Sequence, residues 1–200
     1  MISTIREVLR FLSTDTINIW TVILVYFWFV WSIKMICSLF YRPIRSNFTA
    51  PVSIIITTYH EDKDILAETI NRALWYPKDI VPEVIIVTDH QEPNVTIDLQ
   101  VKYANEPRIR VVSVPPGKRE AVDTGIRLAI NEIVVLVDSD TFLDEKTIYE
   151  LVKPFGNERI GGVVSDQRIH NPYVSLVNFF NALTESIKFN ITVPALSVFG

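Results

Sequence analysis

Two aspartates separated by a single residue, Asp138 and Asp140, follow directly after the apolar run 133–137. Carboxylates this close repel each other, and moving them out of water without a counter-charge costs free energy. A divalent cation would offset both charges, and magnesium or manganese takes oxygen ligands while it also binds substrate phosphates. The pair therefore indicates a metal site. The alternative is that Asp140 or Asp144 caps a following helix.

Polar side chains also follow two earlier apolar runs. Residues 57–62, Thr-Thr-Tyr-His-Glu-Asp, follow the first run, and Asp89 follows the second. If the runs are parallel strands, their carboxyl ends meet at one edge of the sheet and the polar groups converge there. For residues 57–62 a simpler alternative stays open, because threonine and aspartate are also favoured in a turn that caps a helix.

A proline–glycine turn with basic residues after it, 115–120, precedes a helical pattern. The start of a helix presents backbone N–H groups to an anion, and Lys118 would add a positive charge. The alternative is a turn with solvated basic residues. The segment lacks the spacing of a P-loop, and the chain carries neither G-x-G-x-x-G nor G-x-S-x-G. Nothing in the sequence therefore favours those three kinds of site.

Charge and cysteine content exclude other classes of function. The net charge of −4 gives no electrostatic reason to expect a nucleic acid as a partner. The single cysteine, Cys37, excludes a disulfide within the chain and a zinc site built on cysteines. The histidines His60, His90 and His170 are far apart and lack the spacing of metal ligands. We interpret them as solvated loop residues.

The elements that must position these residues follow an alternating pattern. Continuous apolar runs rich in β-branched residues predict strands buried on both faces at 52–57, 84–88, 109–114 and 133–137. We expect a fifth strand at 161–165. Apolar residues at helical spacing predict helices over 64–75, 118–130, 143–155 and 173–191. Strands that alternate with helices indicate an α/β fold with a mainly parallel sheet and flanking helices.

The segment 17–41 is long and apolar enough to cross a bilayer. Hydrophobic residues make up 48% of the whole chain, and the excess is concentrated in this segment, whose only charge is Lys34. About 20 apolar residues suffice for a membrane-spanning helix, and Trp20 and Tyr41 are placed for its two interfaces. A cleaved signal peptide is disfavoured, because the stretch is too long and no small-residue cleavage site follows it.

Positive charges near the span predict its orientation and, with it, the organisation of the chain. They are Arg6 and Arg10 before the span and Lys34, Arg42 and Arg45 in or after it. The positive-inside rule then favours a cytoplasmic C-terminal side. The expected parts are an N-terminal segment 1–16, a single-pass transmembrane helix 17–41, a linker 42–50 and a cytoplasmic domain 51–200.

Four motifs, taken in order, resemble the glycosyltransferase family 2 domain, which has the Rossmann-like GT-A fold. They are VSIIITTYHED (52–62), VIIVTDH (84–90), GKREAVDTG (117–125) and VLVDSDT (135–141). Each motif is common by itself, but their joint order is specific, and the resemblance covers residues 51–200. The hyaluronan synthase group, related to chitin and cellulose synthases, is the more similar part of the family. That narrowing rests on segments 117–121 and 137–141, on 161–163 followed by Asp166 and Asn171, and on the tail 193–200.

The resemblance implies transfer of a hexose from a UDP-sugar to a growing polysaccharide or another glycan, with inversion at the anomeric carbon. A bound Mg²⁺ or Mn²⁺ would stabilise the leaving diphosphate. The implied donor-site roles are as follows. Thr57 and Tyr59 would line the uracil and ribose site, with Glu61 nearby, and Asp89 would accept a hydrogen bond from uracil. Lys118 would meet the diphosphate. Asp138 and Asp140 would bind the metal, with Asp140 the direct ligand.

The chain also departs from the family pattern. Thr88 stands where many members have a second aspartate, and His90 stands where glycine is common. One span precedes the domain, where many synthases have two. The family's general-base aspartate, its Q-x-x-R-W acceptor motif and its pore-forming helices would lie beyond Gly200. We therefore expect a truncated or split product, and the catalytic base stays unknown.

Three hypotheses stay open at this point. The first is a membrane-anchored glycosyltransferase, or its donor-binding part, with a glycan or lipid-linked acceptor. The second is a polyprenyl-phosphate sugar transferase, which shares the first motifs, although segment 118–121 and the C-terminal tail argue against it. The third is an inactive membrane protein that binds a nucleotide or joins a partner chain supplying the missing C-terminal half.

Overall fold

The computed structural model of the chain describes residues 16–44 and 46–198. The predicted N-terminal segment, apart from Thr16, lies outside these residues, as do Arg6, Arg10 and Arg45, on which the predicted orientation partly depends. The chain divides into two compact units, Ile44–Ser165 and a smaller one that joins Met1–Pro43 to Asp166–Gly200. The domain limits predicted from the sequence stay a prediction.

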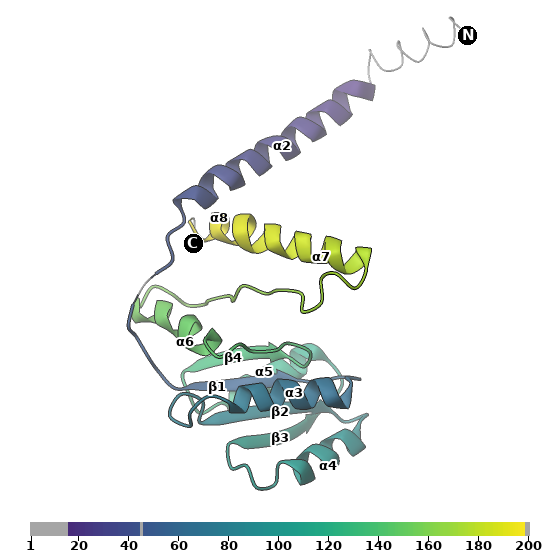
Figure 1. Cartoon of the computed structure of the whole chain (residues 1–200), viewed down its shortest axis with the longest axis vertical. Helices are drawn as coiled ribbons and strands as arrows, with labels where there is room; N and C mark the ends of the chain where they lie inside the picture. Colours follow the sequence, from purple (N-terminus) through teal and green to yellow (C-terminus); the bar gives the residue numbers. More distant parts are fainter. Residues whose placement is uncertain (1–15, 45, 199–200) are drawn as a thin grey trace, which may run out of the picture. The chain divides into compact units, whose positions relative to one another are not determined.

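The larger unit is built on a four-stranded sheet in the order β3-β2-β1-β4, and every neighbouring pair is parallel (Figure 1). The strands are β1 (Val52–Thr57), β2 (Glu83–Asp89), β3 (Ile109–Val114) and β4 (Ile133–Asp138). The chain adds β2 and β3 on one side of β1 and then places β4 on the other side. This reversal of direction leaves a crevice beyond the carboxyl ends of β1 and β4, where ligands of such sheets bind.

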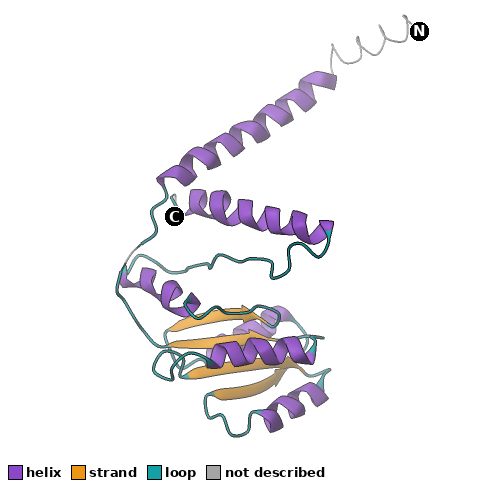
Figure 2. Ribbon diagram, in the orientation of Figure 1, coloured by secondary structure: helices purple, strands orange, loops and turns teal. Residues whose placement is uncertain are grey.

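Strands β1 and β2 are buried on both faces, which explains their continuous apolar runs. The edge strands β3 and β4 are mostly only partly buried, and Leu136 of β4 is 55% exposed, so the prediction of burial on both faces is wrong for these two strands. Alternate side chains of β1 point to opposite faces of the sheet. Ile54 and Ile56 belong to a core cluster that includes Ile70 of α3, whereas Ile55 belongs to a second cluster with Ala121 of α5. Figure 2 shows helices on both faces of the sheet. The predicted α/β class with a parallel sheet and flanking helices is confirmed.

The helices of the larger unit begin at recognisable signals. The carboxylate of Asp62 accepts hydrogen bonds from the N–H groups of residues 64 and 65 and so caps α3. Pro93 opens α4, a position that suits its fixed φ angle. The helices are α3 (Lys63–Leu74), α4 (Pro93–Lys102), α5 (Lys118–Leu128) and α6 (Thr147–Val152), and the 3₁₀ turn η1 (Lys153–Gly156) follows α6.

Three elements differ from the sequence prediction. Residues 161–165 form no strand, and two adjacent glycines give that run little side-chain surface to pack. The helix predicted over 143–155 is reduced to α6 and η1, because residues 141–146 form an irregular segment and a turn. Helix α4 was not predicted, since its sequence PNVTIDLQVK has a weak apolar periodicity.

Helix α5 approaches the sheet closely at one glycine. A Cβ atom added at Gly125 would lie 2.5 Å from Cγ2 of Ile55, a distance that real Cβ atoms do not show. Ile55 is completely buried in the centre of β1. The absence of a side chain at Gly125 therefore fixes how near the helix packs, and with it the position of the helix start above the sheet.

The smaller unit contains α2 (Thr16–Phe40), α7 (Leu176–Ile187), the π-helical turn η2 (Lys188–Thr192) and α8 (Val193–Ser197). Helix α2 packs against η2 and α8. Its segment Trp20–Phe40, with a mean hydropathy of 2.0, has the length and composition to cross a membrane, and none of it is buried. In α7 the apolar side chains of Leu176, Val177 and Phe180 are exposed. The helix predicted over 173–191 thus starts later and changes to a π-helical turn before its end.

Candidate donor and metal site

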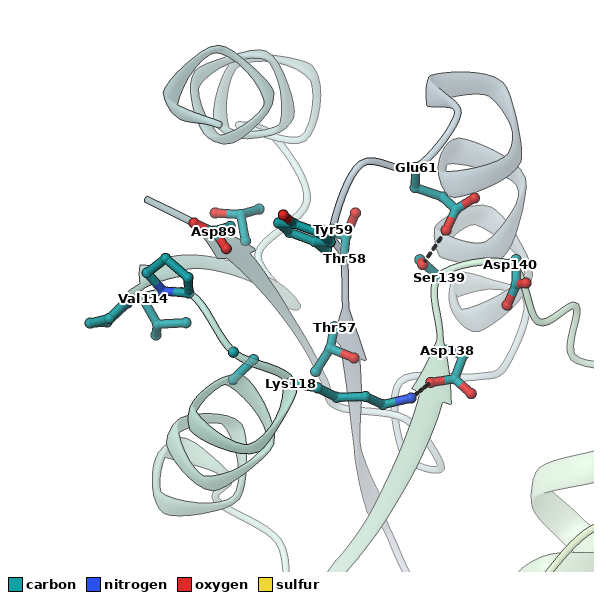
Figure 3. A pocket seen from close by; sticks show the side chains of 15 residues that line it. Thr57, Thr58, Tyr59, Glu61, Asp89, Val114, Lys118, Asp138, Ser139 and Asp140 are labelled. Atoms are coloured by element: carbon teal, nitrogen blue, oxygen red, sulfur yellow. Dashed lines mark hydrogen bonds and ion pairs between the residues drawn. The ribbon is translucent and has the colours of Figure 1, made fainter. Parts of the chain in front are cut away.

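The carboxyl ends of the strands open into a pocket with a volume of about 660 Å³. Figure 3 shows it with Asp89 and Val114 on one side and Asp138 and Asp140 on the other. Every residue that the motifs assign to the donor and metal site lines this pocket: Thr57, Tyr59, Glu61, Asp89, Lys118, Asp138 and Asp140. The structure therefore brings the predicted residues together, and their individual roles stay predictions.

The two aspartates at the end of β4 flank a residue that fixes the turn between them. Ser139 is buried, whereas Asp138 and Asp140 are exposed. The hydroxyl of Ser139 donates a 2.8 Å hydrogen bond to Oε2 of Glu61, and its carbonyl accepts one of 2.8 Å from Oγ1 of Thr69. Figure 3 shows the bond between Ser139 and Glu61. The loop after β1 and helix α3 thus hold the turn at Ser139. The carboxylates of Asp138 and Asp140, on either side of Ser139, line the pocket.

The alternative that Asp140 or Asp144 caps the following helix is wrong. Helix α6 begins at Thr147, its cap position is Lys146, and no side-chain hydrogen bond caps it. The loop after β1 contains both a helix cap and side chains that meet at the edge of the sheet, the two alternatives for residues 57–62. Asp62 caps α3, while Tyr59 and Glu61 line the pocket.

A buried tyrosine anchors the chain that follows the acidic pair. The hydroxyl of Tyr76 donates to the carbonyl of Asp144 and accepts a 3.4 Å hydrogen bond from the N–H of Ile148. Burial raises the pKa of Tyr76 above its ordinary value. The segment between β4 and α6 is therefore tied to Tyr76, two residues beyond the end of α3.

The start of α5 supplies positive charge to the pocket. Nζ of Lys118 lies 2.6 Å from Oδ1 of Asp138, and both side chains are more than half exposed. Figure 3 shows this lysine extending toward the aspartate. Gly117 precedes it at a φ of 137°, which only glycine adopts readily. No side chain caps the helix, so its first N–H groups are available to an anionic ligand together with Lys118.

The opposite side of the pocket carries a buried carboxylate. Asp89 is 5% exposed, and its Oδ1 accepts a 2.7 Å hydrogen bond from the N–H of Gln91. Thr88 shares a 2.6 Å hydrogen bond with Thr96 of α4. The hydroxyl at position 88 therefore ties α4 to the sheet.

Sequence reasoning missed the contacts that join the loops around the pocket. Nδ1 of His60 lies 3.0 Å from Oε1 of Glu92, and Nδ1 of His90 lies 2.8 Å from Oγ of Ser113. Both histidines are exposed, as expected, but each ring pairs with a neighbouring segment and is not merely solvated. One local signal pointed to the position of Glu92. It is followed by a proline, which favours the first position of a helix, so Glu92 lies in the loop between a strand and that helix.

The carboxylates of Asp138 and Asp140 fit a divalent cation that a bound ligand also coordinates. Among residues 16–44 and 46–198, no three histidine, cysteine, aspartate or glutamate side chains are grouped to hold a metal ion by themselves. Asp138 and Asp140 offer exposed carboxylate oxygens. Mg²⁺ and Mn²⁺ prefer oxygen ligands, and Mg²⁺ is usually held by one or two carboxylates, with waters and substrate phosphates completing its shell.

Comparison with known proteins identifies relatives of this chain. The family model described as "Glycosyl transferase family 2" matches residues 53–186. Hyaluronan synthase from Streptococcus pyogenes serotype M3 is 27% identical over 198 residues, which cover 94% of this chain and 46% of the relative. Poly-beta-1,6-N-acetyl-D-glucosamine synthase from Staphylococcus aureus is 27% identical over 157 residues, covering 76% and 37%. The chain thus spans about half the length, or less, of these curated relatives.

A solved structure shares the fold. The mannosyltransferase PcManGT from Pyrobaculum calidifontis, in complex with GDP-Man and Mn²⁺, aligns with a TM-score of 0.58 at 23% identity. The alignment covers 80% of this chain and 45% of that one. This likeness supports the GT-A fold that the motifs predict.

Proposed function

The chain belongs to glycosyltransferase family 2, and from that premise we propose that it transfers a hexose from a UDP-sugar to a growing polysaccharide or another glycan. Transfer would proceed with inversion at the anomeric carbon. The observation that carries the proposal is one pocket lined by all the residues that the family motifs assign to the donor and the metal. The activity is a proposal for the whole protein, since this chain spans 46% of the hyaluronan synthase it matches.

The charges around the pocket suit a nucleoside diphosphate with its base toward Asp89. A buried carboxylate accepts a hydrogen bond from a ring N–H, which uracil carries at N3 and cytosine lacks. Lys118 and the first N–H groups of α5 would meet the diphosphate, and Lys118 would then exchange Asp138 for phosphate oxygens. Asp138 and Asp140 would hold Mg²⁺ or Mn²⁺, which supplies charge stabilisation to the leaving diphosphate.

A polysaccharide acceptor is supported by the two relatives named above, whose names describe synthases of hyaluronan and of poly-beta-1,6-N-acetyl-D-glucosamine. We prefer it for this reason to a polyprenyl-phosphate acceptor, while a lipid-linked glycan stays within the proposal. The family motifs assign no residue of this chain to the general base, so the proposal names none.

The donor site is tested directly by calorimetry of the detergent-purified full chain. We expect UDP to bind in the presence of Mn²⁺ and to bind at least ~10-fold more weakly after EDTA is added, because the metal bridges the carboxylates and the diphosphate. CDP in Mn²⁺ serves as the control for base recognition and should bind more weakly than UDP. Absence of UDP binding by a sample with a folded circular dichroism spectrum would refute the proposed donor site.

We also propose that α2 anchors the chain as a single membrane span, with the sheet on the cytoplasmic side and lipid around the helix. The exposed apolar side chains and the 25-residue length of α2 support this. Deletion of residues 1–45 is expected to move the protein from the membrane pellet to the supernatant after ultracentrifugation. The full chain, treated in the same way, is the control.

A truncated chain that still pellets with membranes would contradict α2 as the sole anchor. Attention would then turn to α7, because an exposed apolar face on a helix favours binding at a membrane surface. Aggregation is distinguished from membrane binding by adding detergent, which releases only membrane-bound protein.

A further inference from the structure

The loop after β1 is held from both sides by consecutive residues. His60 contacts Glu92 in the loop after β2, whereas Glu61 accepts a hydrogen bond from Ser139 in the loop after β4. The two strands that these loops follow are the neighbours of β1 in the sheet. The residue immediately before this pair, Tyr59, lines the pocket. The loop is therefore clamped next to the side chain that it presents to a ligand.

Glu92 binds His60 twice. Its Oε2 accepts a 2.9 Å hydrogen bond from the backbone N–H of His60, and its Oε1 lies 3.0 Å from Nδ1 of the same residue. His60 has a φ of 53° and is the only residue other than glycine with a positive φ among residues 16–44 and 46–198. The left-handed conformation costs free energy in a residue with a Cβ atom, so the surrounding contacts must maintain it.

The same histidine contacts the tyrosine. The ring centroids of Tyr59 and His60 lie 4.1 Å apart, with an angle of 54° between the planes. Tyr59 is 57% exposed, so little else packs against its ring. A half-exposed tyrosine loses rotamer freedom when a ligand covers it, and that loss weakens binding unless the ring is held beforehand.

We propose that the His60–Glu92 bridge positions Tyr59 for the nucleobase of the donor, so that both residues determine donor affinity without contacting the diphosphate. The inference rests on the proposed function, because it assumes that the base lies between Tyr59 and Asp89. His60 and Glu92 act as positioning residues. The bridge holds the loop that carries Tyr59, and the His60 ring holds the tyrosine ring.

A neighbouring ion pair provides a matched control. Nζ of Lys63, in α3, lies 2.7 Å from Oδ2 of Asp98, in α4. This hydrogen bond and the nearby carboxylate raise the pKa of Lys63. The Lys63–Asp98 pair thus joins α3 to α4. The His60–Glu92 bridge joins the loops that precede these two helices. Neither of its members lines the pocket, so its loss should leave donor binding unchanged.

Two ligands separate the base side of the pocket from the phosphate side. Binding of UDP and of inorganic pyrophosphate, both with Mn²⁺, is measured by calorimetry on the full chain. We expect Glu92→Ala to weaken UDP binding ~10-fold and to change pyrophosphate binding less than ~2-fold. Asp98→Ala should change neither. Glu92→Gln keeps an acceptor oxygen for the N–H of His60 and should recover part of the UDP affinity.

A double-mutant cycle tests whether the bridge acts through the tyrosine. If it does, Glu92→Ala should add little to the loss of UDP affinity already caused by Tyr59→Ala, because coupled residues are not additive. Additive losses would contradict the proposal. An equal fall in UDP and pyrophosphate affinity would also contradict it, since that pattern indicates general damage to the loops. Unchanged UDP binding in Glu92→Ala, in a variant that melts like the wild type, would overturn it as well.

Failure of the proposed function gives a different result from failure of this inference. If the wild-type chain bound no UDP with Mn²⁺, the donor site itself would be refuted, and the positioning role with it. If the wild type bound UDP and the variants of Glu92 bound it equally well, only the positioning role would be refuted. A poorly folded Glu92→Ala is replaced by Glu92→Gln, for which a partial loss is expected and an unchanged affinity contradicts the proposal.

Discussion

Asp140→Ala is expected to abolish metal-dependent binding of UDP. The substitution removes one of the two carboxylates that would hold the cation, while Asp138 already pairs with Lys118 at 2.6 Å. A Mg²⁺ or Mn²⁺ ion would then keep one protein ligand at most and would lose its bridge to the diphosphate. We expect the affinity for UDP in Mn²⁺ to fall at least ~10-fold, about 1.4 kcal/mol, to the value that the wild type shows in EDTA. Calorimetric titration, with Mn²⁺ and with EDTA, measures both values.

The matched control removes the same charge away from the pocket. Asp123 lies on α5 and pairs with Arg127 on the exposed face of that helix at 2.8 Å, and it does not line the pocket. Asp123→Ala should therefore leave UDP binding and its metal dependence unchanged. If Asp140→Ala behaved like this control, the acidic pair would hold no metal, and the acidic turn would need another explanation.

Gly125→Val is expected to destabilise the larger unit more than any exposed substitution. The new Cβ would start 2.5 Å from Cγ2 of Ile55, and the two further methyl groups of valine would crowd the same place. Ile55 cannot turn away easily, because a β-branched side chain has few χ1 rotamers and the surrounding strands bury it. We expect a loss of about 2–4 kcal/mol in the free energy of unfolding, measured by urea denaturation.

Two variants check the cause of this loss. At Gly162 an added Cβ meets nothing within 4 Å, so Gly162→Ala should change the free energy of unfolding by less than about 0.5 kcal/mol. Combining Gly125→Ala with Ile55→Ala should destabilise less than the sum of the two single changes. The smaller side chain at 55 removes the clash with the new Cβ at 125, and that Cβ fills part of the cavity left at 55. Wild-type stability in Gly125→Val would mean that α5 does not approach β1 as closely as described.

The sheet was largely predictable because all four strands carry continuous apolar runs, although only β1 and β2 are buried on both faces. Strands β1 and β3 have the predicted limits, and β2 and β4 extend the predicted runs by one or two polar or charged residues. Those extra residues include Asp89 and Asp138, which continue the ladders into the pocket. Helix α4 escaped prediction because it packs on the sheet with few apolar residues, of which Leu99 is the most deeply buried.

The composition of the site was predictable for a topological reason. Parallel strands send their carboxyl ends to one edge, so polar residues after each apolar run had to meet there. The partners within the site were not predictable in the same way. His60 and Glu92 are 32 positions apart, and no local pattern relates a histidine after one strand to a glutamate after the next. Such a pairing depends on the left-handed turn at His60 and on the spacing of the strands.

The links between the strand-end loops also limit how this site can be redesigned. Replacing the loop 58–62 alone with that of a relative would take away the partners of Glu92 and of the Ser139 hydroxyl in a single step. A chimera built in this way would lose contacts on both sides of its new loop, whatever the quality of the graft. Successful exchange of donor preference should therefore require the loops after β1, β2 and β4 to be transplanted together, as one module.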